Sequence, residues 1–585
     1  MGDYVLVCRP PGDPAAETLS ADLAREARSQ GLIVSDINPH TWLALRGPAL
    51  PGRLQVGGWV LIGDIFNRRA PILPLHRAGD PWDYERKMVA RFWGRYVGVL
   101  FGARDQITAL LRDPSGALEC VTWSHGGLTL VCSSAEDWLV GRLRPDWRIN
   151  VERVSQAMHD PLSGTGILLL DGPVALEPGT VQPLPVARAP QVLWSPSDVA
   201  AKSLGAAPSI DEAITELRTA VDDAVIGLAG LPGPMACEVS GGLDSSIIAS
   251  SLTRHAPDAV GLWINTYGST PESDERPYVE TLERALGLTV RRVPHASGEM
   301  TPAWLEAISG GFRPGLNALD HLQDLAWARE INAAGAAAVM TGKGGDSILF
   351  QAATMDVFAD VWQAKGWRAL GYPDLLELAA SNEVSVWSMV QNARRYRRGG
   401  HRPPERDHPL LRPRAGGAAI HPWLNDLGRF GPAKAFQIAG VVDSVSHHGP
   451  SALTRTVDVR HPLCTQPVIE ACLSLPTSLL TVGGRDRGLA RRAFRERLPA
   501  TIVDRRSKGE MTRIYGRLVV DNLDILRPWL IEGRLAELGV IDRAAAEAEL
   551  TQEALIWRGH YSVILTAAAM EGWVRTWERR LGSAA

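Results

Sequence analysis

A loop rich in glycine and serine, residues 239–246, is the stretch of this sequence best suited to chemistry. The largely apolar run at 235–239 predicts a buried strand before the loop, and the run at 247–252 predicts the first turns of a helix after it. Glycines let the backbone approach a ligand closely, and a helix N-terminus offers free N–H groups to an anion. We therefore predict a phosphate site at this loop. The candidate ligand-binding residues are Ser240, Gly241, Gly242, Leu243, Asp244, Ser245 and Ser246.

Asp244 is the one acidic side chain of this loop. A carboxylate beside phosphate is repelled unless a cation lies between them, and Mg2+ prefers carboxylate and phosphate oxygens. We therefore expect Asp244 to hold Mg2+ against a bound nucleotide. The loop is not a Walker A motif, because no Gly-Lys-Ser/Thr follows its glycines.

The segments around this loop alternate between strand and helix patterns. Strands are predicted at 260–267, 290–293 and 336–340, with a helix at 279–286 between the first two. This order is typical of a doubly wound parallel sheet, in which ligands bind at the carboxyl ends of the strands. Residues 341–347 follow the last of these strands and contain three glycines and Asp346. By themselves they are more typical of an ordinary Gly-rich turn than of a functional loop.

The sequence Ser-Gly-Gly-Leu-Asp-Ser-Ser at 240–246 resembles the pyrophosphate loop of N-type ATP pyrophosphatases, most closely that of the asparagine synthetase superfamily. This resemblance implies an enzyme that cleaves ATP between its α and β phosphates and forms an acyl-adenylate. Residues 341–347 resemble the second signature of the superfamily, which implies that Asp346 joins Asp244 as a Mg2+ ligand. It also implies that Gly344 and Gly345 contact ATP.

Two lysines are the candidate catalytic residues. Lys343 lies three residues before Asp346, where β-lactam synthetases carry a tyrosine, so the proton relay of that family does not transfer to this chain. Segments 458–463 and 485–492 also resemble the synthetase site, and 505–510 continues the match. In relatives a lysine at the place of Lys508 contacts the phosphates or the charge that develops in the transition state. The alternative for Lys508 is a solvent-facing charge.

Residues 1–185 contain several predicted strands, at 4–8, 59–66, 97–101, 108–112 and 128–132. Arg112–Gly116, followed by a strand and Ser133-Ser134, resembles the glutaminase domain of asparagine synthetase, an N-terminal-nucleophile (Ntn) sandwich. That enzyme requires a cysteine at position 2 and an Asn-Gly-Glu stretch, but this chain has Gly2 and lacks the stretch. We expect this domain to release no ammonia from glutamine, and to act structurally or to hold a larger substrate.

The predicted fold class is α/β, with this β-rich sandwich at 1–185, a Pro-containing linker at 186–208 and an adenylating domain with extra helices at 209–585. Ser209 and Glu212 form a predicted capping box at the start of the last domain. Residues 415–580 are expected to be helical. The run 394–414 holds eight arginines, and we expect no regular structure through most of it; it is either a solvated loop or a guide for an acidic peptide or partner.

Composition excludes several other classes. The net charge of −4 gives no argument for nucleic acid or a membrane surface, and no apolar run is long enough to span a membrane. The six cysteines are scattered without a Cys-x-x-Cys pair, which favours reduced thiols in the cytoplasm.

Four hypotheses about function remain, of which three are enzymatic and one is binding without catalysis. Gly2 disfavours a glutamine-dependent asparagine synthetase, and Lys343 disfavours a β-lactam synthetase, although a related enzyme acting on a small amino acid stays open. The combination most resembles a lasso peptide cyclase, a macrolactam synthetase that adenylates an Asp or Glu side chain for attack by the N-terminal amine of a peptide. This implies ATP and Mg2+ as cofactors. The implied partners are a precursor core peptide, a leader peptidase and a small peptide-recognition protein. A scaffold that binds without chemistry is the fourth reading.

Overall fold

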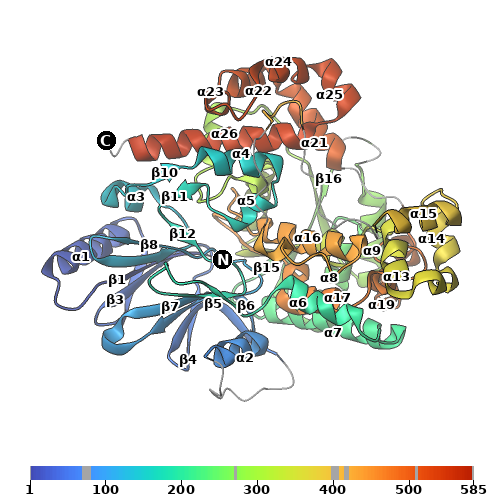
Figure 1. The fold of residues 1–585 in the computed structure, drawn as a ribbon, viewed down its shortest axis with the longest axis horizontal. Helices are drawn as coiled ribbons and strands as arrows, with labels where there is room; N and C mark the ends of the chain where they lie inside the picture. Colours follow the sequence, from blue (N-terminus) through green and yellow to red (C-terminus); the bar gives the residue numbers. More distant parts are fainter. Residues whose placement is uncertain are drawn as a thin grey trace.

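Alternating side chains in the N-terminal strands build a sandwich of two antiparallel sheets (Figure 1). The computed structural model describes residues 2–68, 81–268, 270, 273–396, 408–413, 421–506 and 511–582. The first sheet has the order β12 (Val174–Ala175), β8 (Val121–His125), β9 (Leu128–Cys132), β1 (Asp3–Cys8), β3 (Thr41–Arg46) and β2 (Ile33–Asn38). The second has the order β14 (Gln191–Val192), β13 (Thr180–Pro183), β7 (Ile107–Arg112), β6 (Phe92–Phe101), β5 (Trp59–Asn67) and β4 (Gly52–Val56). All five strands predicted in this region are present.

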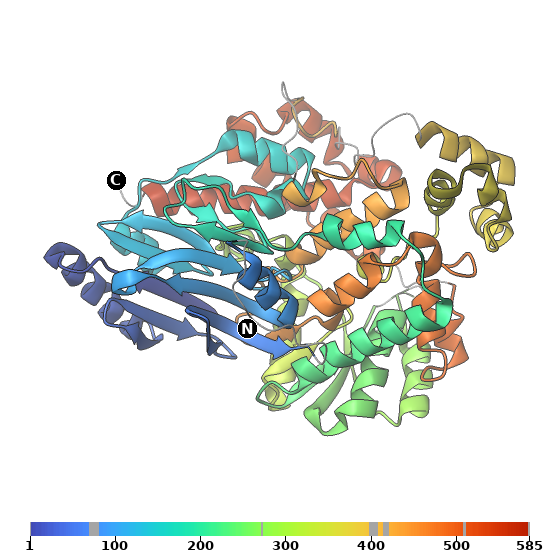
Figure 2. The same cartoon turned by 60° about the horizontal axis from the view of Figure 1, so that its bottom comes forward.

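Side chains of β1 show why the first sheet is buried on both faces. Tyr4 and Leu6 point into the core between the two sheets, whereas Val5 and Val7 point to the opposite face. That opposite face packs in one core with Trp577 of the long helix α26 (Tyr561–Gly582). The N-terminal sheets therefore share hydrophobic cores with the C-terminal half of the chain, and Figure 2 shows the two halves packed along their length.

The C-terminal half is built on a five-stranded parallel sheet, as predicted. Its order is β17 (Val290–Pro294), β16 (Val260–Tyr267), β15 (Met235–Glu238), β18 (Ala338–Met340) and β19 (Asp458–Arg460). The chain leaves β15 toward β16 and later returns on its other side as β18, so the loop after β15 lies at the switch point of the sheet. The helix α8 (Leu243–His255) begins directly after that loop, and α9 (Arg276–Leu286) connects β16 to β17.

The strand β19 corrects the expectation that residues 415–580 are helical throughout. Asp458 and Arg460 are charged, but their side chains are 0% and 1% exposed. Arg95 of β6 donates to Asp458 Oδ1 at 3.0 Å, and Arg460 Nε donates to Asp458 Oδ2 at 2.8 Å. Because ion pairs replace apolar contacts here, a strand is buried without the apolar pattern that would have revealed it.

The remaining predicted segments are placed as follows. The capping box at Ser209 and Glu212 is confirmed at the start of α7 (Ile210–Ala229). Segment 186–208 contains β14, the short helix α6 (Pro196–Ala200) and a 3-10 turn at Ala201–Leu204. The basic run begins inside α15 (Val386–Tyr396), and its residues 397–407 and 414 lie outside the described ranges. Within the part of the chain that is described, every helix is too short or too polar to cross a bilayer.

Candidate active site

Two loops meet at the carboxyl ends of β15 and β18. These strands are parallel neighbours, with Cys237 opposite Met340, so the residues that follow them lie side by side. A Cβ added at Gly345 would overlap the carboxyl carbon of Asp244, and one at Gly342 would lie 2.6 Å from the backbone nitrogen of Ser245. The glycines of the second loop are therefore what allow it to press against the first.

Hydroxyl groups fix the shape of the first loop. Ser240 N donates to Ser245 Oγ at 3.1 Å, and Ser246 Oγ donates to Gly242 O at 2.7 Å. Gly241 has a φ of +73°, in the left-handed region that favours glycine, and Gly242 precedes α8 as its N-cap. Ser246 is fully buried and shapes the loop from beneath.

A cavity of about 1040 Å3 lies over these loops, and it is lined by several of the residues predicted from the sequence. They are Ser240, Gly242, Leu243, Asp244, Ser245, Lys343 and Asp346. The lining does not include four other predicted residues, Gly241, Ser246, Gly344 and Gly345, whose contact with ATP stays a prediction. Gly344 has a φ of +85°, and a Cβ added there would overlap the sulfur of Cys464, so the turn requires glycine at this position.

Asp244 and Asp346 converge on a single point. The nitrogen Nη1 of Arg487 lies 2.7 Å from Asp244 Oδ2 and 2.8 Å from Asp346 Oδ1. Two carboxylate oxygens that can face one cation are a suitable donor set for Mg2+, with the remaining positions open to phosphate or water. The residues present therefore fit the metal site predicted from the sequence, and the site also contains a guanidinium that the prediction did not include.

Arg487 is held firmly in this position. Its side chain is 6% exposed, its φ is +52°, and its backbone N–H donates to Phe350 O at 3.0 Å. Burial opposes its charge, but Asp244 and Asp346 raise the pKa of the guanidinium above its ordinary value. The sequence match at 485–492 contains four arginines, and nothing in their spacing shows which of them reaches the aspartates.

Of the two candidate catalytic lysines, Lys343 lies within the described residues and Lys508 does not. Lys343 is exposed to the cavity, and its Nζ donates to Asn317 Oδ1 at 2.9 Å. Lys508 lies outside the described residues, so its role stays a prediction. Arg505, three residues earlier, donates to Gly241 O at 3.2 Å and stacks over the Tyr278 ring at 3.7 Å. The segment leading to Lys508 is thus anchored on the first loop.

A comparison with protein families decides the relationship of this chain to known enzymes. Residues 216–575 match the asparagine synthase family, which is more than half of the 585 residues. The chain belongs to the asparagine synthase family. A search of curated proteins found no match. The family match spans both loops, Arg487 and Lys508, and it makes this protein an ATP-dependent, amide-forming enzyme in the general sense.

The cavity also contains acidic side chains from the start of α11 (His321–Ala333). Asp320 precedes α11 and Asp324 lies in its first turn, and both line the cavity. Burial raises the pKa of Asp324 to about 6, although Ser451 and the Lys343 ammonium work against this rise. A carboxylate with a pKa near neutrality is suited to accept a proton. Sequence reasoning missed Asp324, since an acidic residue in the first turn of a helix is common.

The N-terminal domain offers no room for a nucleophile at position 2. Gly2 N donates to Ala49 O at 2.8 Å, and a Cβ on Gly2 would overlap the carbonyl of Arg46. Gly47, whose φ is +132°, lies so close that a Cβ added to it would overlap the Cα of Gly2. The loop that carries Arg46 and Gly47 therefore occupies the space that a cysteine side chain would need.

Proposed function

We propose that this asparagine synthase family member closes a macrolactam in a peptide. ATP activates an Asp or Glu side chain of the substrate as an acyl-adenylate, pyrophosphate leaves, and the peptide's own N-terminal amine displaces AMP. The observation that carries this proposal is the extent of the cavity. The central cavity of about 1040 Å3 shares Gly268, His295 and Tyr515 with a second one of about 610 Å3. It shares Asn317, His447 and His461 with a third of about 710 Å3.

Such a connected space suits a folded peptide better than a single amino acid. A peptide must be held with both reacting ends together, and contacts along its length offset the entropy lost in that ordering. The third cavity reaches residues of the N-terminal domain, among them Gly2 and Arg46. This gives a domain without a nucleophile a role in enclosing the substrate.

We assign a different step of the reaction to each group of residues that faces the cavity. The 240–245 loop would bind the phosphates of ATP, with Asp244 and Asp346 holding Mg2+, which neutralises phosphate charge when bound. Arg487 and Lys343 would add positive charge where the departing pyrophosphate gathers negative charge. Asp324, which also lines the cavity, would accept the proton of the attacking amine.

A β-lactam-type reaction on a small amino acid is the alternative function. Lys343 stands where that family needs a tyrosine, and a small substrate would leave the two adjoining cavities without a role. An ammonia-forming asparagine synthetase is disfavoured by Gly2 and by the closed space around it.

The biological setting belongs to the same proposal. A leader peptidase and a small peptide-recognition protein would supply the core peptide. All six cysteines are free and buried, which is consistent with our proposal that the enzyme works in the reducing cytoplasm.

The test separates the two half-reactions. The enzyme is incubated with ATP, Mg2+ and the leader-free core peptide encoded beside its gene, and exchange of labelled pyrophosphate into ATP and product mass are followed. We expect AMP, pyrophosphate and a product lighter by one water. Asp244→Asn should abolish both exchange and cyclisation, whereas Asp324→Asn should retain exchange and lose at least about 100-fold in cyclisation, as for loss of a general base.

Asp258→Asn is the matched control, because this aspartate is exposed and lies away from the cavity. It should leave both half-reactions unchanged. Conversion of a small β-amino acid while the peptide stays linear would contradict the macrolactam proposal. Full exchange by Asp244→Asn would contradict the assignment of the nucleotide site.

A further inference from the structure

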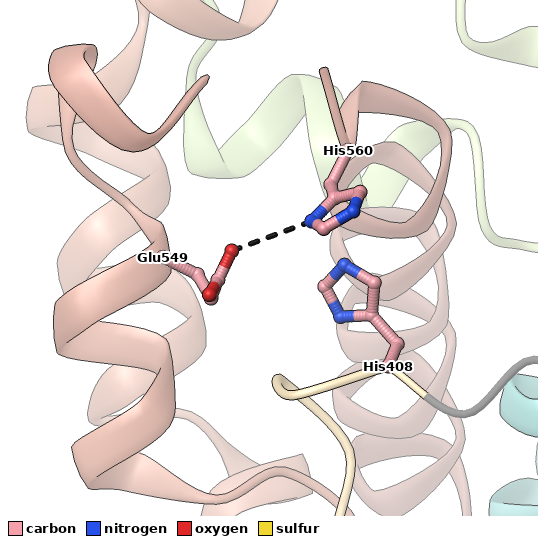
Figure 3. Close-up of side chains that lie close together, drawn as sticks. All are labelled: His408, Glu549 and His560. Carbon is pink, nitrogen blue, oxygen red and sulfur yellow. Dashed lines mark hydrogen bonds and ion pairs between the residues drawn. The ribbon is translucent and has the colours of Figure 1, made fainter. Parts of the chain in front are cut away.

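A second cluster of ligand-type side chains lies outside the lining of the catalytic cavity. His408 comes from segment 408–413, Glu549 ends α24 (Arg543–Glu549), and His560 directly precedes α26. Figure 3 shows the three side chains pointing toward one another from these separate segments. Their potential ligand atoms all lie within 4.8 Å of one another.

The cluster is buried to a degree that is unusual for a carboxylate. The side chain of Glu549 is 4% exposed, that of His560 is 35% exposed, and His408 is buried. Glu549 Oε2 lies 3.4 Å from His560 Nδ1, and the rings of His408 and His560 meet edge to face with centroids 4.3 Å apart. Arg558, whose side chain is 54% exposed, pairs with Oε1 of Glu549 from the solvent side.

We propose that His408, Glu549 and His560 bind one divalent transition-metal ion of the Zn2+ class. Two imidazoles and one carboxylate are a recurrent protein ligand set for zinc, with a fourth position left for water. An all-oxygen preference makes Mg2+ and Ca2+ poor matches for this set. The arginine pair at Oε1 leaves Oε2 directed at the histidines, as a monodentate ligand requires.

Metal binding should also change one local bond. Leu410 N donates to His408 Nδ1 at 3.1 Å, so the ring proton of a neutral His408 lies on Nε2. Coordination through Nε2 moves that proton to Nδ1 and breaks the bond from Leu410. Loading of the site is therefore coupled to a rearrangement of segment 408–413, which is a specific consequence of this proposal.

The position of the cluster gives the ion a structural role. Gly559 and Tyr561, on either side of His560, line the catalytic cavity, while His560 itself faces the cluster. An ion bound here joins the start of α26, the end of α24 and segment 408–413, and so fixes one wall of that cavity. The proposal does not depend on which amide the enzyme forms.

The test uses the full-length protein after dialysis against a chelator. Zn2+ is titrated by calorimetry, and Co2+ is added as a spectroscopic probe whose visible bands report its coordination. We expect one equivalent of Zn2+ to bind and to raise the thermal midpoint of wild type. His560→Gln and Glu549→Gln should each weaken binding by at least about 100-fold, since even an outer-shell partner is worth about 10–100-fold. His125→Gln, at the end of β8, is the matched histidine control and should bind like wild type.

Hydrogen exchange adds a readout that is independent of affinity. The amides of 408–413 and 559–562 should change their protection on Zn2+ addition in wild type and not in Glu549→Gln, which keeps the size of the side chain. If wild type binds no stoichiometric ion, the proposal is wrong. If His560→Gln and Glu549→Gln bind as tightly as wild type, the ion sits on surface histidines and the proposal is equally wrong.

Discussion

Glycines decide how closely Asp244 and Asp346, the two proposed Mg2+ ligands, can approach each other. Gly345 lies against the carboxyl group of Asp244, and the backbone of the second loop brings Asp346 to the same cation position. Any side chain at position 345 must push the two loops apart. The spacing of the aspartates is therefore set in part by the glycine that precedes Asp346.

Gly345→Ala should lower ATP–pyrophosphate exchange by at least about 100-fold, since a displacement of about 1 Å in a catalytic site can cost this much. Gly371→Ala is the matched control, because a Cβ there meets no atom within 4 Å and its φ is not in the left-handed region. Exchange rates of both variants are compared at saturating ATP. Wild-type exchange in Gly345→Ala would show that the loops tolerate separation.

Gly2→Cys tests the N-terminal pocket at the same scale. A cysteine at this position supplies the missing thiol, but the carbonyl groups of Arg46 and Ala49 occupy its space. We expect no glutamate above the buffer rate when the variant is incubated with glutamine, ATP and substrate. Sustained glutamate release would mean that the loop 46–49 yields and that only the nucleophile had been lost.

Sequence reasoning worked best where function is encoded locally. The loop at 240–246 was predicted because its glycines, serines and aspartate are contiguous, and the structure places it at a strand end as expected. Arg487 was not predicted as a member of the site, because it reaches the aspartates over 141 and 243 positions of the chain. A contact of that separation leaves no trace in local spacing.

At the scale of elements, β19 shows how a strand can be stabilised by charge. Asp458 is fully buried between Arg95 of the N-terminal domain and Arg460 of its own strand. The Arg95 guanidinium, with Arg460, holds the pKa of Asp458 well below its ordinary value although burial opposes this. The strand completes the parallel sheet and at the same time ties that sheet to β6.

Asp458→Asn should therefore destabilise the protein strongly. It leaves the buried Arg460 guanidinium without a carboxylate and Arg95 with Asp64 alone, a loss of about 3–5 kcal/mol. The shift of the unfolding midpoint in urea measures this effect. Asp36→Asn, an exposed aspartate on β2, should change stability by no more than about 0.5 kcal/mol. Equal midpoints for the two variants would show that water reaches the ion pair.

The strands β15, β16 and β18 were predicted from their apolar residues, whereas β19 was not predicted. The difference lies in the kind of side chain that each strand buries. β15, β16 and β18 bury their side chains by apolar contact, and this pattern is visible in the sequence. β19 buries charged side chains through partners contributed by a distant strand. A strand that is buried through charge pairs with a distant strand leaves no such pattern in its own sequence.

At the scale of the whole molecule, the two halves of the chain share a polar joint as well as hydrophobic cores. Glu119 of the N-terminal half pairs with Arg313 of the C-terminal half at 2.7 Å. Burial alone would raise the pKa of Glu119, but Arg112 and Arg313 lower it to about 2. The sequence indicated two domains and gave no sign of this joint, because its members are far apart in the chain.

Glu177 belongs to the same polar contact between the two halves, and its carboxyl group ionises near neutral pH. Its Oε1 lies 3.7 Å from His421 Nε2, its side chain is 18% exposed, and Oε1 has no hydrogen-bond partner among the described residues. Burial raises the pKa of Glu177 to about 7, although Arg112 and Arg313 lower it. Burial lowers the pKa of His421 to about 3, so the imidazole remains neutral and offers no compensating charge.

The sign of the effect on stability follows from these values. Between pH 4.5 and about 7 the folded protein keeps a proton on Glu177 that the unfolded chain has lost. Stability must then fall as the pH rises through this window, by up to about 3 kcal/mol. Glu177→Gln keeps the shape of the protonated carboxyl and cannot ionise. The variant should match wild type near pH 4.5 and become the more stable protein as the pH approaches 7 and above.

Urea unfolding of both proteins at a series of pH values measures this difference. The contribution of His421 is the same in both, so it cancels when one curve is subtracted from the other. A difference that stays constant across the window would mean that Glu177 ionises at its ordinary pH and that the joint is hydrated. A difference that grows with pH would show that the contact between the two halves, and with it the enclosure of the third cavity, weakens as Glu177 becomes charged.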